Sequence, residues 1–238
     1  FVRSGIFDSE NVVSIIPGSK FPNEYIVISA HLDAHGTHDG KIYNGADDDG
    51  SGNVSILEIA ESFAIAVKDG HPPKRSIIFL HVTAEEKGLI GSKYYVDNPL
   101  YPLKNTIANL NIDMIGRIDP KRKDEDPNYI YLIGSDKISQ ELHNISEKIN
   151  STYTQLKLDY KYNDDKDPNR FYYRSDHYNF AKNNIPVIFY FNGVHEDYHE
   201  PTDTADKINY ELLEKRTKLI FHTAWELANR EKKLSINK

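Results

Sequence analysis

The sequence predicts an α/β fold, a sandwich in which helices cover both faces of a largely parallel central sheet. β-rich runs alternate with helical segments along the chain, and several of these runs are apolar enough to be covered on both faces. Residues typical of metal sites follow the ends of separate runs, where open α/β sheets bind ligands. The 238 residues contain no internal repeat or linker, so we predict a single domain over residues 1–238.

The predicted strands are short segments rich in β-branched and aromatic residues, bounded by turn residues. Residues 76–83 form a nearly continuous apolar run of this kind. Residues 12–16 and 26–31 are predicted to pair as a hairpin at one side of the sheet, because Pro17-Gly18 and a Pro/Asn-containing turn lie between them. The other predicted strands are residues 107–112, 129–133 and 185–191.

A helix is predicted over residues 51–68, where Asp69-Gly70 and two prolines end the pattern. The apolar residues that recur in it at helical spacing are Val54, Leu57, Ala60, Ala64 and Val67. Further helices are predicted over residues 89–96, 137–149 and 209–233. Residues 33–52 are rich in Gly, Asp, His and Asn and are predicted to form a long functional loop, and residues 120–128 a charged loop.

Composition excludes several classes of function. The net charge of −7 argues against a nucleic-acid partner, which requires a basic surface. No run reaches the roughly 18 apolar residues of a membrane span, so no membrane partner is expected. The chain has no cysteine, which excludes disulfides and thiolate zinc sites. Any zinc site must therefore use His, Asp and Glu.

Candidate metal ligands follow the ends of separate predicted strands. They are His31, Asp33, Glu85, Glu86, Asp113 and His199. Each has an ordinary explanation when taken alone: a surface turn for the His-Leu-Asp run, a solvated pair for the two glutamates, a capping or hydrogen-bonded Asp113, and an incidental loop His199. Their agreement at one predicted sheet edge favours a metal site.

The run that begins at Asp47 permits a rival interpretation. Asp47, Asp49, Ser51 and Glu58 nearly match the ligand positions of a calcium EF-hand loop. An EF-hand needs a helix that enters the loop, whereas the preceding residues are rich in Gly, His and Asn, and Glu58 lies inside the predicted helix over residues 51–68. A calcium-binding module is therefore the non-enzyme alternative.

The same motifs together resemble the M28 family of zinc aminopeptidases and carboxypeptidases. They occur in the family's order and cover the chain from about residue 11 to the last helix. The matching segments are His31-Leu32-Asp33, residues 45–52 (GADDDGSG), Glu85-Glu86, residues 111–116 (NIDMIG), Arg174-Ser175-Asp176-His177 and Tyr198-His199. The resemblance implies a three-layer sandwich whose mixed, mainly parallel sheet is flanked by helices, as in zinc exopeptidases of the phosphorylase/hydrolase-like fold.

The resemblance also implies a role for each matching residue. The implied metal ligands are His31, Asp48, Glu86, Asp113 and His199. Asp48 would bridge two zinc ions, His31 and Asp113 would complete one site, and Glu86 and His199 the other. Glu85 would be the general base and acid, and Asp33 would orient His31. Zinc suits these ligands, although cobalt or manganese could substitute.

The implied reaction is hydrolysis of a peptide bond at a chain end. Two ions about 3.5–4 Å apart can share a carboxylate and a bridging hydroxide. Glu85 would take the proton of the attacking water and pass it to the leaving amine. Arg174 resembles a substrate-contacting arginine, with an exposed Arg paired to a local acid as the alternative, and Tyr198 is a candidate to help hold the oxyanion. His35 and His38 lie near the predicted site but are assigned no ligand role.

Four further matching or neighbouring residues have less defined roles. Asp176 and His177 also match the family and are candidates for structural or supporting roles. Tyr172 and Tyr173, next to Arg174, are candidates to line an apolar pocket, although core packing is the commoner fate of aromatic side chains.

The leading expectation is an aminopeptidase that acts on peptides with free N-termini, because an acidic, metal-lined pocket suits an α-amino group. The enzyme alternatives are a carboxypeptidase or dipeptidase of the same family, or a glutaminyl cyclase of the same fold with one zinc ion. A metal-free receptor-like domain is opposed by the intact ligand set. Resemblance to secreted relatives leads us to expect export, and the start at Phe1 is compatible with a trimmed form.

Overall fold

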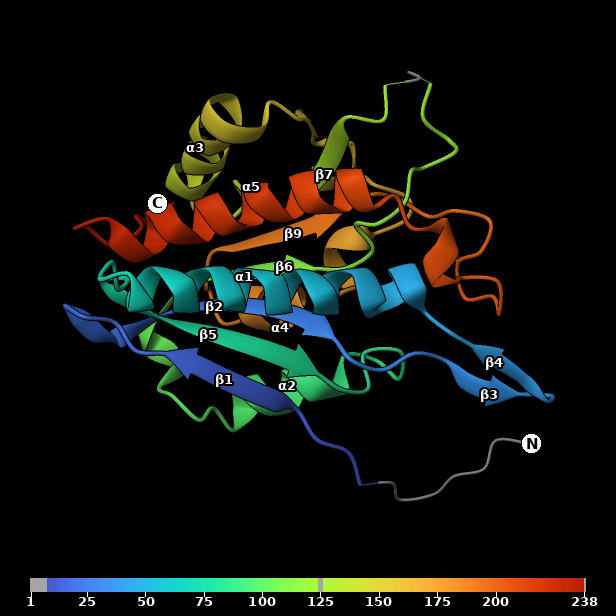
Figure 1. The fold of residues 1–238 in the computed structure, drawn as a ribbon, viewed down its shortest axis with the longest axis horizontal. Coiled ribbons are helices and arrows are strands. Elements are labelled where there is room, and N and C mark those ends of the chain that lie inside the picture. Colours follow the sequence, from blue (N-terminus) through green and yellow to red (C-terminus); the bar gives the residue numbers. More distant parts are fainter. Residues whose placement is uncertain (1–7, 124–125, 238) are drawn as a thin grey trace.

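The structure, a computed structural model, describes residues 8–123 and 126–237. Within these residues, seven strands form one sheet in the order β1-β5-β2-β6-β9-β7-β8, and β3 and β4 form a separate hairpin (Figure 1). The strands are Val12–Ile16 (β1), Phe21–His31 (β2), Gly36–His38 (β3), Lys41–Tyr43 (β4), Arg75–Val82 (β5), Thr106–Ile112 (β6), Tyr129–Ile133 (β7), Lys157–Asp159 (β8) and Val187–Phe191 (β9).

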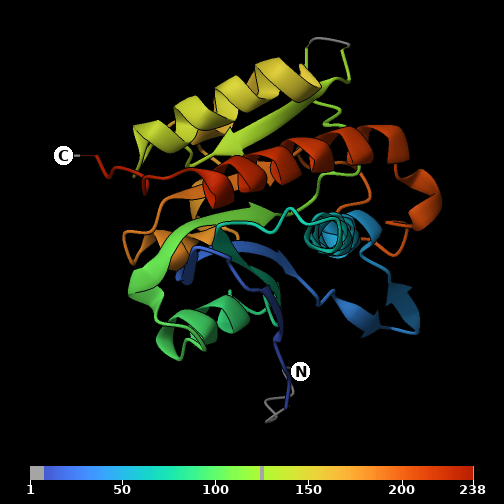
Figure 2. The same cartoon turned by 60° about the vertical axis from the view of Figure 1, so that its left-hand side comes forward.

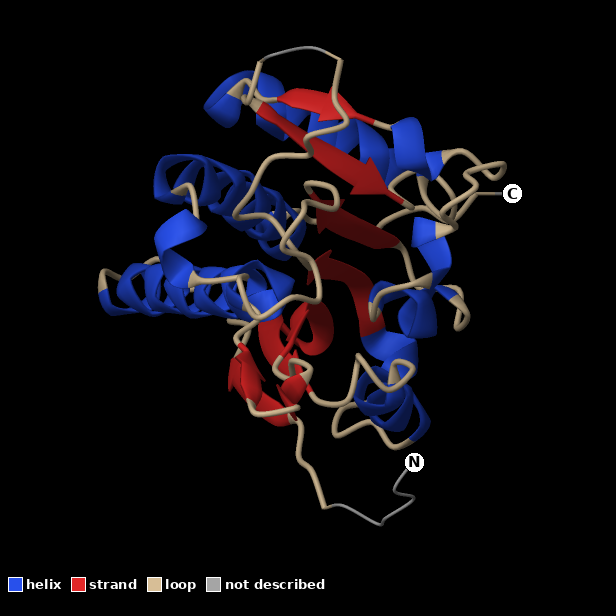
Figure 3. Ribbon diagram, turned by 90° about the vertical axis from the view of Figure 1, so that its right-hand side faces the viewer, coloured by secondary structure: helices blue, strands red, loops and turns tan. Residues whose placement is uncertain are grey.

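The central sheet is mixed and mainly parallel, which confirms the predicted fold class. Strands β5, β2, β6 and β9 are parallel to their neighbours in this group. At the two sides, β1 is antiparallel to β5 and β7 is antiparallel to β9, while β8 is parallel to β7. The carboxyl ends of the central strands therefore meet at one edge of the sheet, which Figure 3 shows facing the viewer.

Helices cover both faces of the sheet (Figures 1 and 2). One face carries α1 (Gly52–Lys68), α3 (Gln140–Ile149) and α5 (Tyr210–Asn229), and the other carries α2 (Ile90–Asp97) and α4 (His177–Ala181). Short helical turns occupy Ala46–Ser51, Leu103–Asn105, Asn150–Thr154, Lys161–Asn163, Phe171–Tyr173 and Ala205–Lys207. No helix in the described ranges is long and apolar enough to cross a membrane.

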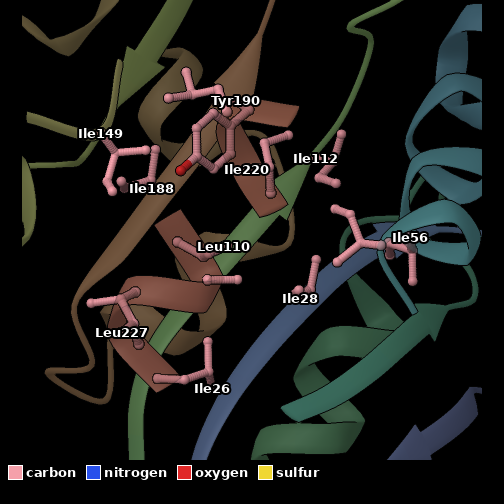
Figure 4. Packing of buried hydrophobic residues seen from close by; sticks show 14 of the residues in the cluster. Ile26, Ile28, Ile56, Leu110, Ile112, Ile149, Ile188, Tyr190, Ile220 and Leu227 are labelled. Atoms are coloured by element: carbon pink, nitrogen blue, oxygen red, sulfur yellow. The ribbon is translucent and has the colours of Figure 1, made fainter. Parts of the chain in front are cut away.

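Alternating residues of β2 and β5 supply two separate hydrophobic layers. Ile28 of β2 and Leu110 of β6 join Ile56 of α1 and Leu227 of α5 in the larger cluster (Figure 4). Val27, next in sequence to Ile28, points to the other face and belongs to the cluster of α2 and α4. Each fully buried aliphatic side chain contributes roughly 1.5–3 kcal/mol. Burial on both faces explains why these strands are almost continuously apolar.

The predicted hairpin of the first two strands is wrong. β1 pairs with β5, which lies between β1 and β2 in the sheet. The segment between β1 and β2 does not form a tight turn but crosses the beginning of β5. The Gly18 backbone N–H donates to Ser76 Oγ at 2.9 Å, and the Phe21 N–H donates to the Lys74 carbonyl at 2.7 Å. A Cβ atom at Gly18 would lie 2.5 Å from the Lys74 carbonyl oxygen, so the crossing requires glycine.

The predicted loops contain more structure than expected. The segment over residues 33–52 includes the exposed β3–β4 hairpin and the helical turn Ala46–Ser51. The three-residue edge strand β8 was not predicted, because such a short segment has little β pattern. In the charged loop over residues 120–128, Asp124 and Glu125 lie outside the described residues.

The buried face of α1 is not the apolar series that indicated the helix in the sequence. Ile56, Ile59 and Phe63 are buried, whereas Leu57 is 60% exposed and Val54 is 46% exposed. Both sets have helical spacing, and the buried set contains the bulkier side chains, so it contributes the larger burial energy.

Truncation of the two sets should therefore have different effects on stability. Ile59→Ala should lower the free energy of unfolding by roughly 2–5 kcal/mol, since it leaves a cavity beneath α1. Leu57→Ala on the same helix should change it by no more than about 0.5 kcal/mol. Urea unfolding followed by circular dichroism measures both values, and a larger loss for Leu57→Ala would contradict the assigned face.

Candidate metal centre

The carboxyl edge of the central strands brings the predicted metal ligands together. His31 is the last residue of β2, and Glu85 and Glu86 follow β5. Asp113 comes directly after β6, and His199 lies in the loop after β9. Parallel strands deliver these side chains to one edge because all of their carboxyl ends point the same way.

Asp48 lies between two histidines, one at the end of β2 and the other in the loop after β9. Its Oδ1 is 3.0 Å from His31 Nε2, and its Oδ2 is 3.1 Å from His199 Nε2. His31 Nε2 is 3.8 Å from Asp113 Oδ1, and His199 Nε2 is 3.4 Å from Glu86 Oε2. Donor atoms of one tetrahedral zinc ion lie roughly 3.3 Å apart when each is about 2.0–2.1 Å from the metal. The spacing fits two neighbouring cation sites that share the Asp48 carboxylate.

Two other aspartates hold the loop that carries Asp48. The Asp203 carboxylate accepts the backbone N–H of Asp47 at 3.0 Å and that of Asp48 at 3.1 Å. The Asp47 carboxylate accepts the Gly116 N–H at 2.6 Å and contacts His195 Nε2 at 3.1 Å. All of these groups are buried, so the loop that carries Asp48 is fixed by charged acceptors in a low-dielectric interior.

Asp49 is a further carboxylate within reach of His31 and Asp113. Its oxygens are already used by the backbone: Oδ2 accepts the His31 N–H at 3.1 Å, and Oδ1 accepts the Gly52 N–H at 2.9 Å and the Met114 N–H at 3.3 Å. We therefore assign Asp49 a structural role and leave the position between the histidines to Asp48.

These contacts do not fit the calcium-binding hypothesis. The carboxylates of Asp47 and Asp49, which would occupy the first and third ligand positions, are turned onto backbone amides. Glu58, which would close the loop, is an exposed residue within α1.

Asp33 supports both His31 and the two glutamates. Its backbone oxygen is 2.9 Å from His31 Nδ1, while its carboxylate is 3.8 Å from the same atom. A carbonyl only accepts hydrogen bonds, so Nδ1 carries the proton and Nε2 keeps a lone pair for a metal ion. The Asp33 carboxylate accepts the Glu85 N–H at 2.9 Å and the Glu86 N–H at 3.2 Å.

The acidic residues of the site repel one another in the absence of cations. Burial, followed by repulsion from Asp113, raises the pKa of Glu85 to about 10. Burial, followed by repulsion from Asp48, raises the pKa of Glu86 to about 7. Glu86 Oε1 is also buried without a hydrogen-bond partner among the described residues. Divalent cations would relieve both the repulsion and the unpaired oxygen, so the residues present fit a metal centre.

A cavity beside the metal ligands has one apolar wall. Asp48, Glu85, Asp113 and His199 line it together with Arg174 and Tyr198. Its apolar lining consists of Met114, Phe171, Phe189, Phe191 and Val194. Arg174 is exposed at the cavity, with Nη2 3.4 Å from Tyr198 Oη, and the Tyr198 ring stacks on His199 at 3.6 Å. Both residues assigned to substrate binding therefore lie next to the candidate ligands.

The predicted lining of the cavity by Tyr172 and Tyr173 is wrong. Phe171 lines the cavity, whereas Tyr172 and Tyr173 line a separate depression with Lys137 and Arg170. Phe171–Tyr173 is a short helical turn, so consecutive side chains point in different directions.

The Arg-Ser-Asp-His run contributes differently at each position. Ser175 Oγ donates to Asp113 Oδ2 at 2.6 Å and thereby orients a candidate ligand. Asp176 is fully buried, and burial raises its pKa to about 7. The His177 ring is buried against Phe189, with ring centroids 4.7 Å apart.

His35 was expected near the site without a ligand role, whereas His195 and Asp203 were not predicted. His35 Nε2 lies 3.3 Å from Glu86 Oε2, and its pKa is lowered, first by burial and then by His199. The spacing His-x-Asp-x-His from His31 to His35 was a usable signal for this residue. His195 and Asp203 are remote from Asp47 in sequence, and nothing in the sequence indicates their contacts with it.

The fold and the site together define a class of α/β proteins that place two adjacent histidine–carboxylate clusters, joined by one aspartate, at the carboxyl edge of a mainly parallel sheet. The chain belongs to peptidase family M28, whose sequence profile matches residues 11–224.

Individual relatives and solved structures agree with this membership. A probable leucine aminopeptidase of Arthroderma otae is 29% identical over 226 residues, which cover 92% of this chain and 57% of that protein. A probable glutamate carboxypeptidase of Arabidopsis thaliana is 36% identical over 105 residues, 44% of this chain and 14% of that protein. The LapA aminopeptidase of Legionella pneumophila superposes with a TM-score of 0.75 at 28% identity, covering 98% of this chain and 58% of that one.

More distant structures share the fold alone. Porphyromonas gingivalis glutaminyl cyclase gives a TM-score of 0.68 at 18% identity, with 90% of this chain and 76% of that chain covered. The chain spans little more than half the length of the aminopeptidase relatives that it matches along most of its own length.

Loss of one acceptor oxygen at Asp203 should weaken both stability and metal binding. In Asp203→Asn, one backbone N–H of the Asp48 loop would face an amide NH₂ instead of an acceptor oxygen. The free energy of unfolding should therefore fall by about 1–3 kcal/mol. Zinc affinity should fall roughly 10–100-fold, because Asp48 loses its support. Urea unfolding and zinc competition with a chromophoric chelator measure the two effects. Asp206→Asn, at an exposed site three residues further on, is the matched control, and equal effects of the two variants would refute the role of Asp203.

Proposed function

We propose that this chain is a two-zinc aminopeptidase that removes residues from the free N-termini of peptides. One observation carries the proposal: the Asp48 carboxylate contacts a histidine of each cluster, at 3.0 and 3.1 Å, beside the buried acid Glu85. His31 and Asp113 would hold one ion, Glu86 and His199 the other, and Asp48 both. When bound, the ions would polarise the scissile carbonyl and lower the pKa of the attacking water.

Glu85 is the proposed general base and acid. It lines the cavity together with Asp48 and Asp113, and Asp33 holds its backbone N–H. The high pKa of Glu85 without cations means that it retains a proton readily, which suits a group that must collect a proton and then release it to the leaving amine. Nearby cations would lower this pKa toward neutrality.

Two features of the cavity support a substrate with an amino end and an apolar first side chain. The carboxylates of Glu85 and Asp113 attract an ammonium group. The wall of Phe171, Phe189 and Phe191 offers an apolar surface to the first side chain. Tyr198 and Arg174, which line the same cavity, are available to hydrogen-bond the carbonyl where negative charge develops.

A carboxypeptidase is the second candidate, because of Arg174. Its guanidinium is exposed at the cavity and could pair with the carboxylate of a peptide C-terminus. The acidic residues around the metal ligands favour the amino end instead.

A substrate panel separates these candidates. The chain should contain about two zinc ions and cleave aminoacyl amides with free amino ends and apolar side chains, and a chelator should abolish cleavage. Metal analysis and chromogenic amides, unblocked and N-acetylated, measure this. Cleavage only of N-blocked peptides with free carboxyl ends would support the carboxypeptidase, whereas full zinc loading without hydrolysis of either set would refute the exopeptidase proposal.

Replacement of Glu85 should separate chemistry from metal binding. Glu85→Gln should lower kcat by roughly 10²–10⁴-fold, since the amide cannot accept and return the proton. The zinc content should stay unchanged, because Glu85 is not a proposed ligand. Steady-state kinetics and metal analysis of the same preparation test both statements. Glu58→Gln, the same chemical change on the exposed face of α1, should leave both unchanged, and residual activity above one tenth in Glu85→Gln would refute the proposed base.

A further inference from the structure

His35 lies beside the Glu86–His199 cluster, although the family resemblance assigns it no role. It follows His31 by four residues and directly precedes β3, at the base of the β3–β4 hairpin. Its side chain is 26% exposed, and its ring centroid is 4.1 Å from that of His199. The ring of Tyr43 on β4 also lies near it, with centroids 6.3 Å apart.

The three side chains converge on one point. Ligand atoms of His35, Glu86 and His199 all lie within 4.8 Å of one another. His35 Nε2 is 3.3 Å from Glu86 Oε2, and His199 Nε2 is 3.4 Å from the same oxygen. Both separations match the roughly 3.3 Å expected between donors of one tetrahedral zinc ion.

The direction of His35 favours a shared cation over a hydrogen bond. Its Nε2 is buried and has no hydrogen-bond partner among the described residues, although Glu86 Oε2 lies within hydrogen-bonding distance. The ring nitrogen is therefore close to the carboxylate without being aimed at it. Two ligand atoms that both point at one ion lie close together in this way without a hydrogen bond between them. Without such an ion, the buried Nε2 would remain unpaired, which is energetically costly.

We propose that His35 is an additional ligand of the ion held by Glu86 and His199. This inference rests on the proposed two-zinc function and extends it. The Glu86 site would then have two imidazoles, Glu86 and the shared Asp48, whereas the other site would have one imidazole, Asp113 and Asp48. The two sites differ in donor set, and the His35 site, with the larger number of protein ligands, fills first with zinc.

The wild-type chain loaded with one equivalent of zinc tests this inference. X-ray absorption at the zinc edge should give about two imidazole ligands per zinc ion, because the ion would occupy the site of His35 and His199. His35→Ala, loaded in the same way, should give about one. Its affinity for the first zinc ion, measured by chelator competition, should fall at least tenfold. His38→Ala, on the same exposed hairpin, should retain the wild-type count and affinity, and circular dichroism checks the fold of each variant.

The outcomes separate this inference from the proposed function. About one imidazole per zinc in the wild-type chain, with two ions bound at saturation, would overturn the ligand role of His35 and leave the two-zinc proposal intact. A tenfold loss of affinity in His35→Ala with an unchanged imidazole count would also overturn it, since His35 would then act only through Glu86. Failure of the wild-type chain to bind a second ion would overturn both.

Discussion

The site depends on one carboxylate held between two histidines. Asp48 contacts His31 and His199 through different oxygens, and it can do so only because its backbone is fixed. Asp203 accepts the N–H groups at and before Asp48, and Asp49 accepts those of neighbouring segments. These two acids bind backbone N–H groups, which leaves the Asp48 carboxylate between the two histidines. Buried charge-assisted hydrogen bonds of this kind are short and directional, so they define the loop more narrowly than packing alone.

A second network of buried side-chain hydrogen bonds connects the central sheet to Asp113. Asn109 donates to Ser29 Oγ, Ser29 donates to Asn111, Asn111 donates to Ser175 Oγ, and Ser175 donates to Asp113. The chain of contacts crosses β2 and β6 and ends on a proposed ligand, and every member is buried. Polar side chains in otherwise apolar strands are costly unless each finds a partner. The orientation of Asp113 is therefore supported by β2 and β6 through Ser175, which lies in the segment before α4.

Strand ends made much of the site predictable. His31, Glu85, Glu86, Asp113 and His199 were found because continuous apolar runs mark covered strands, and the residues after them must share an edge. The position of β1 beside β5 was not predictable, since the order of strands depends on long-range pairing that local turn residues do not encode. The buried face of α1 was not predictable from spacing, because two apolar series of the helix both recur at helical intervals. Contacts of Asp203 with Asp47 link positions 156 residues apart and leave no local pattern.

The acidic residues at the carboxyl edge of the sheet make the stability of the fold depend on both pH and bound cations. Without cations, the folded chain raises the pKa of Glu86 to about 7 and that of Glu85 to about 10, mainly by burial, whereas the unfolded chain ionises both near pH 4.5. The folded state then binds more protons than the unfolded state above pH 4.5, so its stability falls as the pH rises from 4.5 through 7. Burial lowers the pKa of His31, but its interactions with the Asp113 and Asp48 carboxylates outweigh burial and raise it, so His31 adds a loss of the same sign at higher pH. Cations replace these protons, and the metal-loaded fold is accordingly the one suited to neutral pH.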